Sequence, residues 1–459
     1  MENKNSFLGT EPIGKLLWKL AIPTLAAQVI NMLYNLVDRI YIGRGVGSLA
    51  LTGVGVCMPI IMIVSAFAML AGAGGAPRAS IFMGQKDNES AERTLGGCFC
   101  LQLLISVVLT AVLLVWNRPL LMAFGASPNT IEYAVDYMDL YALGTIFVQL
   151  TLGMNAFITA QGFTKTSMLA VLIGAGCNIV LDPVFIFGFH MGVRGAALAT
   201  VISQSLSTVW VLAFLFGKKT HLKLRTPYIR LTPKIVMPCV ALGMAPFIMQ
   251  ASESVIAVCF NSSLLKYGGD IAVTTMTILT SVMQFAMLPL QGIGQGAQPI
   301  ISYNYGARNS DRVRKSFKLL LKVSLGYSML LWVLVLAFPK LFISMFNTEA
   351  PLLAFAPTPL RIYVGALGIF GAQVACQMAF NSLGNAKASI LVAVMRKFIL
   401  LLPLIYIMPA LMPASQTMAV YLAEPIADFL SVAFTVVLFR FQFRKAMKRL
   451  EAPDSGSLI

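Results

Sequence analysis

Charged residues are scarce in this chain of 459 residues. Asp, Glu, Lys and Arg together make up 11% of it, whereas soluble domains carry about 25%. Polar stretches are short as well, and the longest covers residues 217–234. This composition excludes an ordinary soluble protein, and we expect no separate soluble domain.

Histidine and a regular cysteine pattern are also missing. The two histidines, His190 and His221, fall in predicted loops, and no HExxH pattern occurs. A membrane-embedded enzyme needs a nucleophile with its base or a set of metal ligands. The seven cysteines are odd in number and lie in or near apolar runs, so they predict small buried side chains and no disulfide framework. We therefore expect neither an enzyme nor a cofactor.

Long apolar runs are what the chain has in abundance. Hydrophobic residues make up 58%, the mean hydropathy is +0.80, and runs of about 20 apolar residues are long enough to cross a bilayer. We expect an all-α integral membrane protein with twelve transmembrane helices, over residues 16–42, 49–77, 93–116, 131–158, 167–188, 195–216, 237–260, 274–303, 315–338, 360–383, 389–411 and 418–440.

The net charge is +16, and topology explains it better than a nucleic-acid partner, which we do not expect. Lys and Arg concentrate in one set of loops, above all in residues 217–236 and 440–449, whereas the opposite loops carry few of them. Because basic loops stay on the cytoplasmic side, both termini are expected in the cytoplasm. The basic tail is expected to anchor this topology and to contact anionic membrane lipids.

The chain repeats itself at an offset of 222 residues. Five identities fall between residues 72 and 84 and their counterparts, and the register also holds further along the chain. Six spans in each copy put both copies in the same orientation, as in transporters built from parallel repeats around a central cavity. We predict an N-terminal lobe over 1–216, a basic cytoplasmic linker over 217–236 and a C-terminal lobe over 237–459. The shared positions are Gly72/Gly294, Gly74/Gly296, Pro77/Pro299, Ser80/Ser302, Gly84/Gly306, Gln28/Gln250, Tyr141/Tyr363, Gly162/Gly384, Lys165/Lys387 and Ser167/Ser389.

A polar stripe runs along the first predicted span. Its members are spaced by three or four residues, so they share one helix face, and a stripe that ends in a carboxylate indicates a helix lining a wet cavity. Pro23 precedes it and favours a bend. The stripe consists of Thr24, Gln28, Asn31, Asn35 and Asp38.

A second carboxylate lies in the predicted span 167–188. Asn178 and Asp182 are four residues apart and share a face. Pro183 has no N–H, so it leaves the carbonyl oxygen of Ile179 without its helical donor. One interpretation is that Asp182 only forms hydrogen bonds between helices.

The other interpretation is a site for a coupling cation. The carboxylates of Asp38 and Asp182, the amide of Asn178 and the hydroxyl of Thr200 offer oxygen ligands for Na+. Alternatively, the two carboxylates share a proton, because desolvation and like charge both oppose their joint ionisation. The sequence leaves the choice of ion open, and it does not prove that Asp38 and Asp182 meet.

The second repeat does not copy this pair, since Phe260 and Leu404 stand at the equivalent positions. It has Glu253 instead, at the position equivalent to Asn31, and a polar face in span 360–383 that consists of Gln373, Gln377 and Asn381. Span 418–440 adds Glu424 and Asp428, which either take part in coupling or pair with Arg396 or Lys397.

These residues carry a resemblance to the multidrug and toxic compound extrusion (MATE) family, in its bacterial multidrug efflux branch. The resemblance covers nearly the whole chain and rests most on the polar cluster of the first half. It implies a coupling-cation site, for Na+ or H+, at the residues that match this cluster: Pro23, Tyr34, Asp38, Asn155, Asn178, Asp182 and Thr200.

The resemblance also implies what the protein does. It implies export of bulky, often cationic organic compounds from a bacterium across its plasma membrane, by rocking of the two lobes, and we expect a monomer. A flippase for lipid-linked oligosaccharides from the same superfamily is the alternative, but it is expected to hold basic residues in its cavity. The expected substrate cavity is lined by Gln28, Asn31, Met249, Glu253, Met287, Gln373 and Gln377.

Overall fold

The computed structural model describes residues 6–452, and all regular elements in this range are helices. The first half begins with the short α1 and continues with six long segments. Their bounds are α1 Ser6–Thr10, α2 Ile13–Gly45, α3 Ser48–Gly84, α4 Asn88–Ala123, α5 Ile131–Ala160, α6 Thr164–Pro183, the π-helical turn η1 Val184–Gly188, and α7 Gly192–Phe216.

The second half follows a linker that contains the short 3₁₀ turn η2 (Thr226–Tyr228). It is cut into more pieces than the first half. Its elements are α8 Pro233–Gly306, α9 Ser310–Ala337, α10 Pro339–Ser344, α11 Ala350–Phe355, α12 Pro357–Tyr363, α13 Leu367–Ser382, α14 Ala386–Val394, the π-helical η3 Met395–Leu401, α15 Leu402–Leu411, the 3₁₀ turn η4 Pro413–Ser415, and α16 Gln416–Glu451.

Helix α8 contains two of the predicted spans. Eleven helical segments within residues 6–452 are long and apolar enough to cross a membrane, and α8 is counted once although it has 74 residues. A straight helix of that length would measure about 110 Å, far more than a bilayer. The chain turns at Gly269, where φ is +66°. Gly47 separates α2 from α3 at the equivalent repeat position with φ of +118°, so the twelve predicted crossings are accounted for.

The repeat extends to the backbone of the connections. Gly162 and Gly384 both have positive φ, at +86° and +70°, a conformation that glycine adopts without steric cost. The turns after α3 and α8 also match, since Lys86 and Arg308 have φ of +62° and +56°. The identities at an offset of 222 therefore reflect a shared requirement of the backbone.

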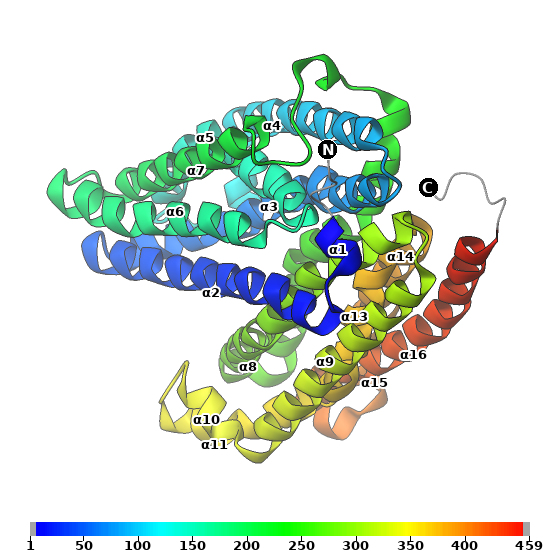
Figure 1. Cartoon of the computed structure of the whole chain (residues 1–459). Helices are drawn as coiled ribbons and strands as arrows, with labels where there is room; N and C mark the ends of the chain where they lie inside the picture. The colour runs from blue at the N-terminus through cyan, green and yellow to red at the C-terminus, as the bar shows by residue number, and fades with distance from the viewer. Residues whose placement is uncertain (1–5, 453–459) are drawn as a thin grey trace.

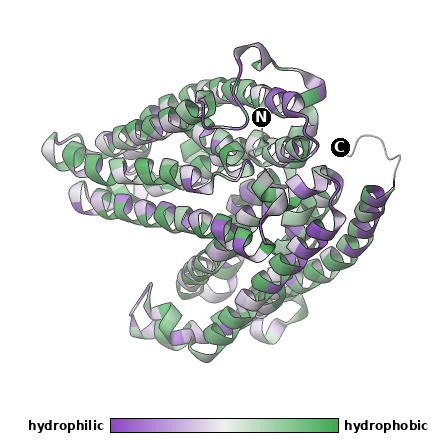
Figure 2. Cartoon of the chain, viewed as in Figure 1, coloured by the Kyte–Doolittle hydropathy of each residue, from purple (hydrophilic) through white to green (hydrophobic). Residues whose placement is uncertain are grey.

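Two bundles of helices make up the molecule. In Figure 1 the elements α2 to α7 form one bundle and α8 to α16 the other; the two lie against each other near α1 and diverge away from it. Hydrophobic residues run along the helices of both, as the green in Figure 2 shows. Across the junction, α3 and α2 both pack along α8.

Very close helix crossings hold the bundles together. A Cβ added at Gly74 would overlap the carbonyl oxygen of Cys239 in α8, and one added at Gly296 would lie 2.6 Å from the Cα of Ala21 in α2. Gly84 likewise meets the carbonyl of Tyr303. Small residues allow helices to approach this closely. Several of the glycines that the repeats share are therefore contact points between the bundles.

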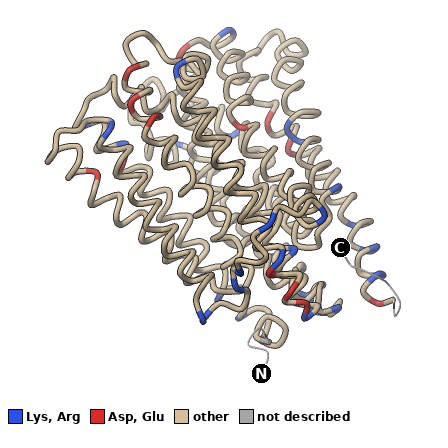
Figure 3. Tube along the Cα trace, turned by 90° about the horizontal axis from the view of Figure 1, so that it is seen from above, with Lys and Arg blue, Asp and Glu red and all other residues tan. Residues whose placement is uncertain are grey.

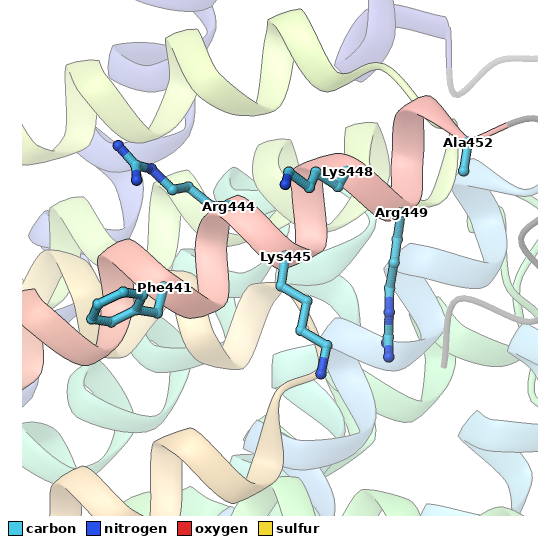
Figure 4. Close-up of a pocket in the computed structure, with 6 residues that line it drawn as sticks. All are labelled: Phe441, Arg444, Lys445, Lys448, Arg449 and Ala452. Carbon is cyan, nitrogen blue, oxygen red and sulfur yellow. The ribbon is translucent and has the colours of Figure 1, made fainter.

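The basic tail lies at the end of α16. Lys and Arg gather around both ends of the described chain in Figure 3. Figure 4 shows that Lys445 and Arg449 point to one side of α16 and Arg444 and Lys448 to the other. Together with Phe441 and Ala452 they line a pocket at this end.

The Gly74 crossing predicts a difference between two glycines of α3. Gly74→Ala should lower the stability by about 1–3 kcal/mol, because overpacking forces the helices apart. Gly55→Ala is the matched control, because nothing lies within 4 Å of an added Cβ there. It should keep or raise the stability, since alanine is favoured over glycine in a helix interior by about 0.5–1 kcal/mol. Thermal unfolding in detergent measures both. Equal melting temperatures for the two variants would contradict this packing of the bundles.

Candidate functional site

The polar stripe of α2 has three parts with different surroundings. At its start Thr24 is buried and donates to the carbonyl of Gly292 in α8 at 2.7 Å. One turn on, the Gln28 amide lies 3.4 Å from Gln295 Oε1. Asn31 and Asn35 are exposed, and Asp38 is buried again at 6% exposure. The stripe thus contacts the second bundle at Thr24 and is buried inside the first bundle at Asp38.

Asp38 and Asp182 face each other within hydrogen-bonding reach. Asn178 lies beside them and directs its Nδ2 toward Asp182 Oδ1 at 3.5 Å and toward Thr200 Oγ1 at 3.3 Å. Tyr34 of α2 adjoins both carboxylates. The structure therefore brings together five of the predicted ion-site residues, from α2, α6 and α7.

Three acceptor atoms of this cluster have no hydrogen-bond donor among residues 6–452. They are Asp38 Oδ1, Asn178 Oδ1 and Asp182 Oδ2, and all three are buried. Buried acceptors that lack a donor are costly, and two neighbouring carboxylates also repel each other. A proton or a small cation relieves both costs. These oxygen atoms therefore suit either a proton or a small cation as the bound species.

The local sequence of α6 explains how Asp182 reaches this position. Asn178 and Asp182 lie on the buried face of α6. Pro183 ends the α-helical hydrogen bonding, and the chain continues as the π-helical turn η1. Such turns occur where the regular backbone pattern is interrupted and are frequent at functional sites. This interruption follows the carboxylate directly.

Two other predicted residues lie elsewhere. The Asn155 amide donates to the carbonyl of Ser167 at 3.3 Å, and Ser167 precedes Asp182 by 15 residues, or about 22 Å of helix. Pro23 is equally far from Asp38 along α2, which remains one helix from Ile13 to Gly45. The structure therefore does not bring Asn155 or Pro23 to the carboxylates.

The second bundle holds its carboxylates in ion pairs. Arg396 donates to Asp428 at 2.7 Å and to Glu424 at 3.1 Å, and its guanidinium lies 4.6 Å from the ring centre of Phe370. Lys397 donates to Glu253 at 2.6 Å. Of the two interpretations of Glu424 and Asp428, the structure shows the pairing with Arg396.

The predicted substrate residues of the second half have mixed positions. Gln377 is buried and donates to Ser389 Oγ at 2.6 Å, and Gln373 is also buried. Gln377 therefore packs against α14 of its own bundle. Met249 and Met287 are partly buried, whereas Glu253 is exposed.

Sequence reasoning missed three neighbours of these sites. Tyr137 of α5 lies beside Thr200, and Gln204 of α7 lies beside Tyr34. Gln204 is four residues after Thr200, so helical spacing alone would have pointed to it. Gln295, the partner of Gln28, lies between two glycines that the repeats share.

Comparison with known proteins gives consistent matches. The family model MatE matches the chain twice, over residues 23–184 and 246–407. The multidrug export protein MepA of Staphylococcus haemolyticus is 23% identical over 422 residues, or 92% of each chain. MepA of Staphylococcus aureus strain N315 is 22% identical over 401 residues, which cover 87% of this chain and 88% of that one.

Solved structures agree with the fold. A MATE crystal structure in a bent conformation superposes with a TM-score of 0.91 at 22% identity, covering 98% of this chain and 99% of the other. A transporter of the MOP superfamily from Pyrococcus furiosus, described as having a binding pocket of reversed polarity, gives 0.88 at 22% identity over 96% and 98%. The chain therefore belongs to the MatE family of multidrug transporters, and it is a transporter and not an enzyme.

Proposed function

We propose that this protein exports bulky organic cations in exchange for Na+ or H+, by rocking of its two lobes. The observation that carries the proposal is the buried pair Asp38 and Asp182 with its unsatisfied oxygens. Within the described part of the chain neither carboxylate forms an ion pair with Lys or Arg, so the site attracts a mobile positive charge. Asn178, Thr200 and Tyr34 complete its polar lining.

Helix α2 supports the link between this site and the lobes. The helix carries Asp38 inside the N-terminal lobe and, closer to its start, the Thr24 contact to Gly292 of the C-terminal lobe. Cation binding at Asp38 thus acts on an element that also belongs to the lobe interface. A cation shifts the equilibrium only if it binds the two conformations with different affinity, and α2 is where we place that difference.

Substrate binds, in this proposal, where the lobes diverge. Asn31 of α2 and Glu253 of α8 are exposed there, and both carry groups that favour cationic or neutral compounds. The flippase alternative needs basic residues for a diphosphate. Arg396 and Lys397 are committed to carboxylates of their own lobe, which disfavours that alternative.

We further propose that the protein acts as a monomer in a bacterial plasma membrane with both termini in the cytoplasm. The basic side chains at the end of α16 support this orientation, since they favour the cytoplasmic leaflet. Arg444, Lys445, Lys448 and Arg449 suit anionic lipid head groups there.

Asp182→Asn tests the coupling site. The substitution keeps the size and polarity of the side chain but removes its charge, so cation-driven export should fall to background. The measurement is counterflow of a fluorescent organic cation in proteoliposomes, with a Na+ gradient and a pH gradient imposed separately. Whichever gradient drives the wild type should fail to drive the variant.

The control is Asp311→Asn, which removes an exposed carboxylate paired with Lys315 and should leave export unchanged. Expression and melting temperature must match the wild type for both variants. Export by Asp182→Asn at the wild-type rate under either gradient would remove Asp182 from the coupling step.

Cross-linking tests the rocking of the lobes. In a background without the native cysteines, Gln28→Cys and Gln295→Cys place two thiols at the lobe junction. A short bifunctional thiosulfonate should stop export, and a reductant should restore it. Each single variant, treated with a monofunctional reagent of similar size, controls for blockage of the pathway. Export that continues after complete cross-linking would contradict rocking at this junction.

A further inference from the structure

A network of five charged side chains lies inside the C-terminal lobe. It joins three elements, with Arg396 and Lys397 on η3, Glu253 on α8, and Glu424 and Asp428 on α16. All three ion pairs are 2.6–3.1 Å long. Three carboxylates face two cations, so the ionised network has one negative charge in excess.

The π-helical turn explains how two consecutive cations serve different partners. Arg396 and Lys397 are both buried, yet the first reaches α16 and the second reaches α8. A π turn inserts a residue into the helix and changes the directions of its neighbours. Lys397 is thereby fixed as the partner of Glu253.

Only one member of the network is open. The Glu253 side chain is 54% exposed, against 4% for Lys397 and no more than 9% for the other three. The network is therefore open to its surroundings at the Glu253–Lys397 pair, whereas the two carboxylates that share Arg396 are buried.

Glu253 also lies where α8 leaves the N-terminal lobe. Phe247 contacts Phe67 of α3 with ring centres 5.0 Å apart, and the Gln250 amide lies 3.5 Å from the carbonyl of Met62. Glu253 follows Gln250 by about one helical turn. The open carboxylate thus lies beyond the last of these lobe contacts, on the proposed substrate path.

We propose that Lys397 is a specificity-determining residue that sets the charge of the substrate. With Lys397 present, Glu253 is neutralised by its partner and the network as a whole carries a single excess negative charge, which suits a compound with one positive charge. Without it, Glu253 loses its internal partner, the excess rises to two negative charges, and compounds with two positive charges gain the advantage. This inference rests on the proposed function, because it assumes that substrate passes Glu253.

The test compares two fluorescent quaternary ammonium probes with the same aromatic skeleton, one with a single charge and one with two. Their equilibrium binding to the purified full-length protein in detergent needs no ion gradient. Lys397→Met adds one net negative charge to the network, and this charge attracts the second positive group of the dication. The affinity for the dication relative to the monocation should therefore rise by about tenfold. Lys397→Arg keeps the charge and should keep the wild-type ratio.

A ratio that stays at the wild-type value in a folded Lys397→Met would overturn the inference. If that variant does not fold, the double variant Lys397→Met/Glu253→Gln removes both partners and leaves no broken ion pair. Compared with Glu253→Gln alone, it should again favour the dication, and equal ratios in these two proteins would also overturn it. Failure here is separable from failure of the coupling site, because Asp182→Asn is tested by gradient-driven transport and not by binding.

Discussion

The fold depends on one constraint: a carboxylate inside a membrane needs a positive partner. The cost of an unpaired charge in hydrocarbon is several kcal/mol, and the two lobes meet it in different ways. The C-terminal lobe pairs Glu424 and Asp428 with Arg396, which belongs to the chain. The N-terminal lobe places Asp38 against Asp182, and within residues 6–452 neither carboxylate forms an ion pair with a Lys or Arg side chain. In the proposed function, the missing positive charge comes from solution.

The repeat explains the scaffold on which this difference stands. Gly74 and Gly296 are shared because the lobes cross there at close range, and Gly162 and Gly384 because both connections need a left-handed backbone. These demands are the same in both lobes, so the residues are the same. The charged sites obey no such common demand, which is why the symmetry ends at them.

Much of this was predictable from the sequence, and the failures have physical causes. Periodicity located the membrane spans, and spacing by four placed Asn178 and Asp182 on one face. It did not show that Gln377 turns toward Ser389 of its own lobe, because a polar helix face faces either a cavity or a neighbouring helix. The sequence also did not separate Asn155 from the ion site. Asn155 contacts Ser167, which lies 15 residues before Asp182 on α6, and a match of residue types does not report this distance. Distances between helices depend on tertiary packing.

The difference between the lobes also suggests why ion and substrate would exchange in the proposed function. The charge on the C-terminal lobe's side of the substrate path is fixed, because releasing Arg396 from its carboxylates would leave a buried charge unpaired. In the proposed function, the charge on the N-terminal lobe's side of that path varies with the cation bound at Asp38 and Asp182. Loading that cation adds one positive charge beside the path, which weakens the binding of an organic cation, and binding of the organic cation weakens the site for the small one by the same factor. Mutual exclusion of this kind is the thermodynamic requirement for exchange across a membrane. A single lobe whose charge changes with cation binding is enough to provide it.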